Sequence, residues 1–295
     1  MAPAVDGFEP IPRVRIIDIA TRPGEPLYWR MFSDLHLDEE LSDRNYLLNR
    51  AKRDKDEFGE VRSLIIGDVS NLVFPIDQRR FTPGVQRKEL SQLGAFVKAA
   101  VNSNSEFLGR LGYKWDLVGL GNHETSALKH YGGDVADEVA RRIGAFRGGY
   151  SGAVDYRIHV TKDGTLPDKK TATTLFRVLY HHGAWGGDIS KGAGKARAWA
   201  EQHDHWHLML YGHNHKSCVH PEVRVRVRGT GLEEYDAYVI DCGSATRAYA
   251  EDARDPGYAE IKGYRREPRK APLVTYTVRW DGRKRRLLTD YSVTV

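Results

Sequence analysis

The chain has 295 residues, of which 40% are hydrophobic and 29% are charged, and this composition excludes an intrinsically disordered protein. No stretch approaches the roughly 18 consecutive apolar residues of a membrane-spanning helix, and residues 1–12 lack the basic and apolar regions of a signal peptide. Two cysteines in a chain of this size are typical of a reducing compartment. We therefore expect a cytoplasmic protein without a membrane partner, and the net charge of +5 favours anionic ligands.

Five short apolar segments have the pattern of β-strands, and each of them ends at a polar motif. The segments cover residues 27–32, 63–66, 115–120, 175–180 and 208–211. The motifs that follow them are, in the same order, Asp34-Leu35-His36, Gly67-Asp68, Gly121-Asn122-His123-Glu124, His181-His182-Gly183 and Gly212-His213-Asn214-His215. Every motif should therefore open a loop at the carboxyl end of a strand.

Helical spacing of apolar residues predicts helices between these strands, at residues 44–56, 87–111, 135–146 and 191–203. Alternating strands and helices predict an α/β domain, in which ligands bind at the carboxyl ends of the strands. From about residue 217 onwards the pattern contains strands only, at residues 223–228, 235–240, 273–280 and 286–295. No linker or repeat divides the chain, so we expect a single domain over residues 1–295 with a β-rich C-terminal part.

The five motifs contain the donor atoms of a metal centre. Carboxylate, amide and imidazole groups are ligands for Mn²⁺, iron or Zn²⁺, and a set without thiolates argues against a purely structural zinc site. Asp34 and His36 lie two residues apart, which puts both side chains on one side of an extended strand end, and His213 and His215 share this spacing. Each motif alone is also typical of an ordinary turn. Because all of them share one geometry, together they predict a dinuclear metal site.

At these positions the chain resembles the calcineurin-like metallophosphoesterases, whose motifs are Asp-x-His, Gly-Asp, Gly-Asn-His-Glu/Asp, His and Gly-His-x-His in this order. The match covers roughly residues 27–216. The resemblance implies a four-layer α/β/β/α sandwich with mixed sheets, in which the β-rich C-terminal part supplies much of the second sheet. It also implies two divalent metal ions as cofactors, with manganese expected first and iron or zinc as alternatives.

The resemblance further implies roles for individual residues. It assigns Asp34, His36 and His215 to the first metal ion, Asn122, His181 and His213 to the second ion, and Asp68 to a bridging position between the two ions. His181 is preferred to His182 because the family's ligand is the first residue after the strand, and His182 is the alternative. His123 would be the catalytic acid, and Glu124 would orient the histidine or a ligand through a hydrogen bond.

The expected reaction is the hydrolysis of a phosphate ester. Two divalent ions close together bind a bridging hydroxide, which attacks the phosphorus in line while a general acid protonates the leaving group. We therefore expect a metal-dependent phosphoesterase that acts on small or nucleotide-like phosphomonoesters or phosphodiesters. Protein phosphatases of this superfamily carry an arginine after the second motif and another before the third, and the chain has Val69 and Leu120 near these places instead.

Two other functions and one other metal site compete with this interpretation. Basic residues concentrate late in the chain, which would suit a DNA nuclease of the Mre11/SbcD type or a merely solvated strand face. These residues are Arg224, Arg226, Arg228, Arg265, Arg266, Arg269, Lys270 and residues 283–286. A non-catalytic scaffold is disfavoured because the chain keeps every expected ligand and the acid histidine. His203, His205 and His207 alternate before the last of the five strands and would form either an additional metal site or a solvated helix end.

Overall fold

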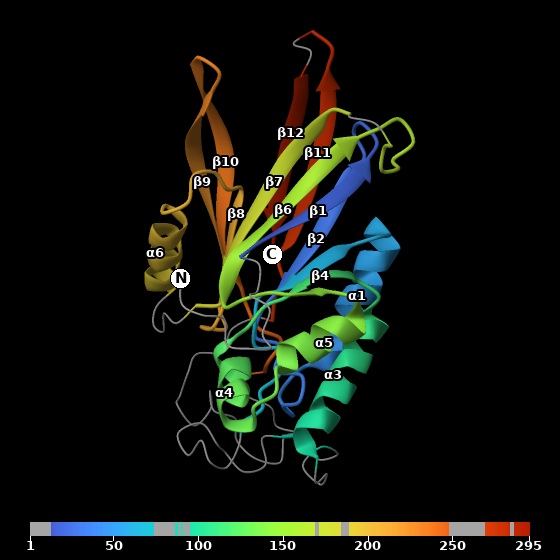
Figure 1. Cartoon of the computed structure of the whole chain (residues 1–295), viewed down its shortest axis with the longest axis vertical. Helices are drawn as coiled ribbons and strands as arrows, with labels where there is room; N and C mark the ends of the chain where they lie inside the picture. The colour runs from blue at the N-terminus through green and yellow to red at the C-terminus, as the bar shows by residue number, and fades with distance from the viewer. Residues whose placement is uncertain are drawn as a thin grey trace, which may run out of the picture.

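The computed structural model describes residues 13–73, 86–87, 90, 95–168, 171–183, 189–247, 269–283 and 286–295, and these residues form two six-stranded mixed sheets (Figure 1). The first sheet consists, in spatial order, of β1 (Val14–Thr21), β6 (Ser151–Val160), β7 (Thr173–His181), β8 (Leu208–Tyr211), β10 (Gly231–Cys242) and β9 (Ser217–Arg228). The second sheet consists of β12 (Arg286–Thr294), β11 (Leu273–Asp281), β2 (Pro26–Phe32), β3 (Arg62–Ile65), β4 (Lys114–Val118) and β5 (Phe146–Arg147).

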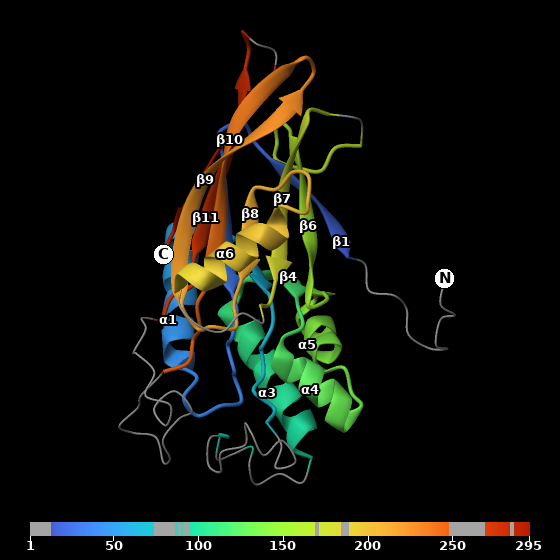
Figure 2. The same ribbon diagram turned by 90° about the vertical axis from the view of Figure 1, so that its left-hand side faces the viewer.

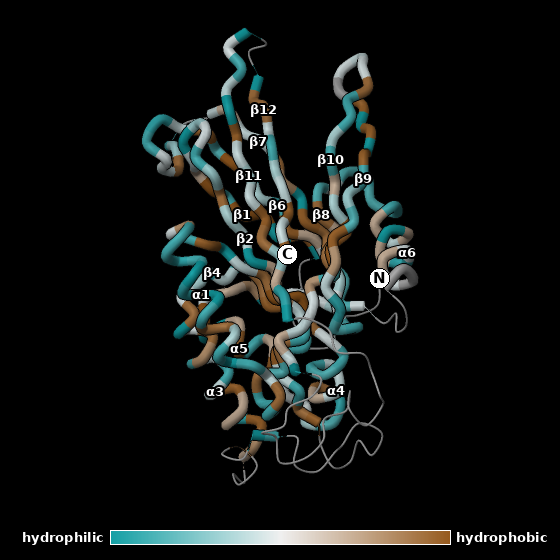
Figure 3. Tube along the Cα trace, turned by 180° about the vertical axis from the view of Figure 1, so that it is seen from behind, coloured by the Kyte–Doolittle hydropathy of each residue, from teal (hydrophilic) through white to brown (hydrophobic). Residues whose placement is uncertain are grey.

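Helices cover the outer face of each sheet. The second sheet packs against α1 (Arg44–Phe58), α3 (Phe96–Leu111), α4 (Asn122–Tyr131) and α5 (Val135–Ile143), whereas α6 (Ile189–Ala200) lies apart from them against the first sheet (Figures 1 and 2). Between the sheets lies a core with the large buried side chains Trp29, Tyr156, Phe176 and Tyr276. Figure 3 shows hydrophobic stretches gathered where the strands pass through the middle of the molecule. The expected four-layer α/β/β/α sandwich with mixed sheets is therefore confirmed.

Local sequence explains where several helices begin and end. Asp43 and Asp134 precede α1 and α5, and their carboxylates accept hydrogen bonds from the backbone N–H groups of Tyr46 and Asp137. Gly144 ends α5 in a left-handed conformation, which costs a glycine little. No helix in the described part of the chain is long and apolar enough to cross a membrane.

Strands β5 and β6 and helix α4 are not among the predicted elements. Strand β6 alternates as a strand should, with Val154, Tyr156 and Ile158 facing the core between the sheets. Helix α4 begins at the third motif, where a loop is expected, and only Glu124 and Ala127 of it are buried, so it lacks a strong apolar stripe. The helix expected at residues 87–111 covers Phe96–Leu111 in the structure, and residues 88–89 and 91–94 lie outside the described part.

The sheet topology brings the polar motifs to one place. Strands β2, β3 and β4 run parallel in the second sheet, as β7 and β8 do in the first, so the carboxyl ends of each group lie at a common edge. Backbone hydrogen bonds continue past these ends, from Asp34 N to Gly67 O at 3.1 Å and from Gly212 N to His182 O at 3.0 Å. The two sheet edges therefore hold the five motifs opposite one another.

Candidate metal centre

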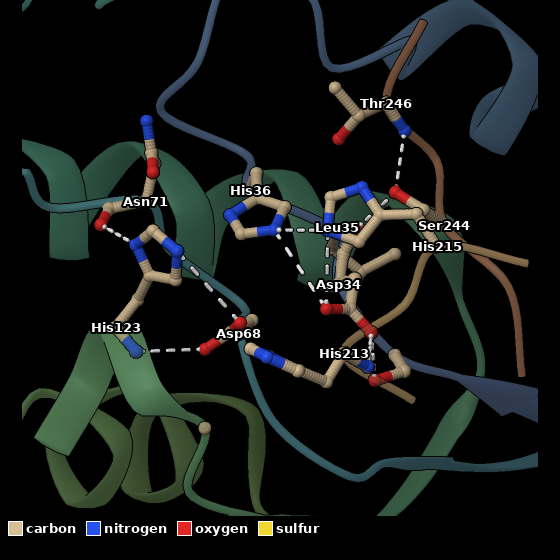
Figure 4. A network of polar contacts seen from close by, with 12 residues as sticks. Asp34, Leu35, His36, Asp68, Asn71, His123, His213, His215, Ser244 and Thr246 are labelled. Atoms are coloured by element: carbon tan, nitrogen blue, oxygen red, sulfur yellow. Dashed lines mark hydrogen bonds and ion pairs between the residues drawn. The ribbon is translucent and has the colours of Figure 1, made fainter. Parts of the chain in front are cut away.

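Seven side chains from the five motifs form three overlapping groups of potential metal ligands, and Figure 4 labels all of them except His182. The groups are Asp34 with His36 and His215, then His36 with Asp68 and His123, and finally Asp68 with His182 and His213. Within each group the potential ligand atoms all lie within 4.8 Å of one another. The structure therefore assembles residues that are up to about 180 positions apart in sequence.

Backbone conformation at these residues is unusual. Asp34, His36, Asp68, His213 and His215 all have positive φ, between 45° and 72°, although none of them is a glycine. Their side chains thus converge through left-handed backbone and not through the extended strand alternation that the spacing suggests. Left-handed residues of this kind cost free energy and persist where surrounding contacts hold them, which is typical of functional sites.

The first group has the spacing of ligands around one ion. His36 Nε2 lies 3.3 Å from His215 Nε2, and Asp34 Oδ1 lies 3.4 Å from His215 Nε2 and 4.0 Å from His36 Nε2. Two ligand atoms about 2.1 Å from one ion are about 3.0 Å apart at right angles and about 3.4 Å apart at the tetrahedral angle. Within the described residues, Asp34 Oδ1 is buried and accepts no hydrogen bond. A buried carboxylate oxygen beside two imidazole nitrogens fits a divalent cation.

A second cluster of donor atoms surrounds Asn122, which begins α4. Asn122 Oδ1 lies 2.7 Å from His213 Nδ1 and 3.1 Å from His182 Nε2, and His182 Nε2 lies 3.0 Å from Asp68 Oδ2. Asp68 also belongs to the group with His36, so one carboxylate lies between the two clusters. This placement fits a ligand shared by two ions.

The neighbouring histidines differ from the expected order, because the structure places His182 and not His181 with the other candidate ligands. Strand alternation explains the difference: Tyr180 faces the core between the sheets, as His182 does, whereas Leu179 faces the outer layer beneath α6. His181 shares the side of Leu179, and its ring contacts Trp199 of α6 with centroids 5.3 Å apart. Because β7 extends to His181, His182 is the first residue after the strand, and the geometry favours this alternative as the candidate ligand.

Charges at the centre favour a cation. Burial is the largest single influence and alone would raise the pKa of Asp34 and Asp68, yet the surrounding histidines, His182 first among them, together outweigh burial and lower both pKa values below the usual range. Burial lowers the pKa of His36 to about 3, which keeps this imidazole neutral. Burial opposes the charge on His182 as well, but Asp68 and Asp34 raise its pKa to about 9. The carboxylates are thus ionised and attract positive charge to the centre.

His123 lies beside the candidate ligands, whereas Glu124 lies behind them and contacts the backbone. The His123 ring lies beside that of His36, with centroids 4.8 Å apart, and His123 Nε2 lies 4.0 Å from Asp68 Oδ2. Glu124 is buried and accepts hydrogen bonds from three backbone N–H groups, those of Asp68 and Gly121 at 2.9 Å and of Ser70 at 3.1 Å. It therefore positions the candidate ligand Asp68 through the backbone and does not contact the His123 side chain.

Two glycines of the motifs lie so close to candidate ligands that no side chain fits at their positions. A Cβ atom at Gly121 would lie 1.9 Å from Asp68 Oδ1, and a Cβ atom at Gly212 would lie 2.6 Å from Asp34 Oδ2. Any larger residue would displace a candidate ligand. The glycines thus belong to the site, as their place in the motifs suggests.

Several supporting residues escape sequence reasoning. Ser244 donates a hydrogen bond from Oγ to the Asp34 carbonyl at 2.7 Å, although it lies 210 positions away (Figure 4). Asp38 accepts hydrogen bonds from the backbone N–H groups of Asn71 and Leu72. Asp38 follows the first motif by two residues, and this proximity is the only sequence signal for either residue.

The histidine triplet forms no ligand group within the described residues. His203 Nδ1 contacts the Trp199 carbonyl at the end of α6, His205 Nε2 accepts a hydrogen bond from Arg226, and His207 Nδ1 accepts one from the Arg177 backbone. These contacts leave the triplet in the first sheet and its helical cover, away from the motifs.

Three basic residues of the C-terminal third lie against acids. Arg226 and Arg286 both contact Glu233, and Arg269 contacts Asp43. Arg265, Arg266 and residues 284–285 lie outside the described part of the chain. Within the described residues, the ion pairs reduce the positive surface that the sequence suggests for a polyanion.

No family model and no curated protein matches the chain. Solved structures with a similar fold include the calcineurin-like phosphoesterase YfkN from Bacillus subtilis, at 11% identity and a TM-score of 0.40, covering 92% of this chain and 91% of that chain. They also include the NAD nucleotidase of Haemophilus influenzae, at 8% identity and a TM-score of 0.44, covering 93% of this chain and 50% of that chain. A third is the 5'-nucleotidase precursor from Thermus thermophilus, at 13% identity and a TM-score of 0.37, covering 92% of this chain and 54% of that chain.

These neighbours include a calcineurin-like phosphoesterase, which bears the name of the family that the motifs resemble. The chain spans only about half the length of the two nucleotidase structures. Identities of 8–13% and TM-scores below 0.5 assign neither a reaction nor a substrate to this chain.

Proposed function

We propose that the chain is a phosphoesterase that depends on two divalent metal ions. One observation carries the proposal: carboxylate and imidazole donors from five separate motifs meet in three overlapping groups, and within each group the ligand atoms lie within 4.8 Å of one another. The Asn122 amide oxygen lies beside the third group, 2.7 Å from His213 Nδ1. Oxygen and nitrogen donors without thiolate suit Mn²⁺, iron or Zn²⁺, and manganese is our first expectation. A cytoplasmic location, expected from the cysteine content, remains part of the proposal.

The ligand set follows from the spacing of the donor atoms. Asp34, His36 and His215 would hold the first ion, Asn122, His182 and His213 the second, and Asp68 would bridge them. Ions bound there would lower the pKa of a coordinated water and neutralise charge on the phosphate oxygens. Glu124 holds the Asp68 backbone, and thereby its carboxylate, in place.

His123 is the proposed general acid. Its Nδ1 donates a hydrogen bond to the Asn71 carbonyl, so Nε2 is the nitrogen that faces the centre and can give a proton to the leaving oxygen. His123 side-chain exposure is 14%, which leaves the ring accessible to a substrate at the surface of the centre.

The proposed substrates are small or nucleotide-like phosphomonoesters or phosphodiesters. The ion pairs of Arg226, Arg269 and Arg286 give no support to a nucleic-acid surface. A scaffold function has no observation in its favour either, because the candidate ligands converge.

The test combines metal analysis with turnover. The purified protein should contain two divalent ions per chain and hydrolyse nitrophenyl phosphate or bis-nitrophenyl phosphate, and chelation should remove both properties. His213→Ala should lose metal and activity, whereas His159→Ala, whose ring contacts Asp18 far from the motifs, should keep both. Equal metal content in the wild type and in His213→Ala would overturn the proposal.

A further inference from the structure

A buried carboxylate outside the candidate ligand set holds the loop that follows the second motif. Asp38 is fully buried, and its two carboxylate oxygens accept hydrogen bonds from consecutive backbone N–H groups, that of Asn71 at 2.5 Å and that of Leu72 at 2.9 Å. Hydrogen bonds to an ionised acceptor are stronger than neutral ones and constrain geometry. Asp38 therefore fixes the backbone at the end of this loop.

The loop needs such a constraint because Leu72 is strained. Leu72 has a φ of 41°, and among the described residues it is the one non-glycine with positive φ outside the candidate ligands. A left-handed leucine costs free energy and persists only where other contacts determine it. The Asp38 carboxylate supplies such a contact at the Leu72 N–H itself.

The same loop holds the proposed acid. The Asn71 carbonyl contacts His123 Nδ1, and because a carbonyl only accepts hydrogen bonds, Nδ1 must carry the proton. Proton exchange is then confined to His123 Nε2, the nitrogen 4.0 Å from Asp68 Oδ2. The position of the Asn71 carbonyl thus decides which nitrogen of His123 can act.

We propose that Asp38 is a positioning residue for His123, acting through the backbone of Asn71 and Leu72. Two buried carboxylates then share the loop of residues 68–72, with Glu124 holding the end that carries the ligand Asp68 and Asp38 the end that carries the acid's partner. The effect of Asp38 on catalysis rests on the proposed phosphoester hydrolysis. The effect of Asp38 on the tautomer of His123 is independent of that proposal.

In the proposed reaction, a bond forms between phosphorus and the oxygen of a water molecule while the bond between phosphorus and the leaving oxygen breaks, and the electron pair of the broken bond stays on the leaving oxygen. His123 would enter this step with both ring nitrogens protonated, give the Nε2 proton to the leaving oxygen and end as the neutral tautomer whose Nδ1 proton stays in its hydrogen bond to Asn71. Esters with poor leaving groups need this proton, whereas a nitrophenolate leaving group departs without it. Loss of the hydrogen bonds to Asp38 should therefore lower turnover of esters with poor leaving groups more than turnover of nitrophenyl esters.

The test replaces Asp38 by Asn, which keeps the shape but places an amide NH₂ against a backbone N–H. In metal-free protein labelled with [¹⁵N]histidine, the wild-type His123 should show the Nδ1-protonated tautomer, and Asp38→Asn should show a tautomer mixture. The Asn71 and Leu72 amides should exchange faster with solvent in the variant. Asp116→Asn, which alters a buried carboxylate between the sheets, should leave the tautomer of His123 unchanged.

Kinetics with bound metal provide the second readout. Asp38→Asn should keep two ions per chain and lower turnover of an alkyl phosphate about tenfold more than turnover of nitrophenyl phosphate, within the about 10²–10⁴-fold typical of a general acid. In the His123→Ala background, Asp38→Asn should cause no further selective loss, because both changes act through one imidazole.

An unchanged His123 tautomer in Asp38→Asn, or equal losses on both esters, would overturn the inference. A wild-type protein without metal or turnover would overturn the proposed function instead, and the tautomer measurement would still decide the role of Asp38. Should Asp38→Asn not fold, Asp38→Ser keeps one acceptor oxygen and allows the same NMR measurement.

Discussion

Buried carboxylates occur in two regions of this protein, and the regions differ in the cation that faces them. Inside the sheets, Asp116 meets the guanidinium group of Arg62 through both oxygens, with Nε to Oδ2 at 2.9 Å, and Tyr156 donates a further hydrogen bond at 2.8 Å. Arg30 and Asp54 form the same kind of pair beside α1. Each of these carboxylates has a permanent positive partner and several donors, so its charge is balanced within the fold.

At the strand ends, the carboxylates of Asp34 and Asp68 face imidazoles and no arginine among the described side chains. An imidazole is a removable cation, because it can give up its proton when a metal ion binds. The arginine pairs stabilise the sheets without any ligand, whereas the strand ends keep two ionised carboxylates beside histidines that can lose their protons. The carboxylates that hold the fold thus differ in their partners from those that we propose as metal ligands.

Asp68→Asn should have the largest effect, because it removes the charge that both ion positions share. An amide bridges two cations poorly, so Asp68→Asn should weaken metal binding. A metal ion stabilises the charge of the transition state by several kcal/mol, and loss of this stabilisation lowers turnover at least about a thousandfold. Elemental analysis should show fewer than two ions per chain. If Asp68→Asn still bound two ions and kept its turnover, Asp68 would not bridge the ions, and its role would no longer differ from that of Asp116.

His182→Ala should have the next largest effect, on one ion only. We expect the affinity of the second position to fall more than about a hundredfold, beyond the about 10–100-fold typical of residues that merely support a ligand. His181→Ala is the matched control, since it removes a neighbouring imidazole that packs against Tyr150 and Trp199. Metal titration of both variants decides which of the two histidines is the ligand. Loss of the ion in His181→Ala would identify His181, as first expected from the sequence.

From the sequence, the candidate ligands are easier to name than some of the elements around them. The ligand types and their order along the chain are visible because metal chemistry restricts which residues serve. The choice between His181 and His182 requires the register of β7, which follows from which residues of the strand face the core. Alternation of Phe176 and Val178 with more exposed neighbours already indicates that even-numbered residues face inward.

Contacts between distant segments account for what remains unpredicted. Ser244 donates to a backbone carbonyl and Asp38 accepts from backbone N–H groups of other loops, and a hydrogen bond to a backbone group leaves no specific trace in sequence. The left-handed φ of Asp34 and His36 is likewise invisible, since residues of these types rarely adopt it without tertiary support. Helix α4 escapes prediction because its buried face is narrow.

Metal binding should depend on pH, because His182 loses its proton in an accessible pH range and the arginines of the buried ion pairs do not. In the metal-free protein, burial opposes the charge on His182 but Asp68 and Asp34 raise its pKa to about 9. A metal ion must displace this proton, so the affinity of the second position should fall about tenfold for each pH unit below 9. Calorimetry in buffers of different ionisation enthalpy should detect about one proton released near pH 7. A pH-independent affinity would exclude His182 as a ligand.

The smallest effect on activity is expected from Asp116→Asn, which tests the other side of the comparison. Breaking its buried pair with Arg62 should lower the free energy of unfolding by about 3 kcal/mol, the low end of the usual range, because the amide oxygen still accepts a hydrogen bond. Urea denaturation measures this loss. Metal content should stay at the wild-type value and turnover within about twofold, since Asp116 lies between the sheets and contacts no candidate ligand in the described structure. A loss of bound metal would mean that the buried ion pairs and the metal centre depend on one another, and that the division between them is wrong.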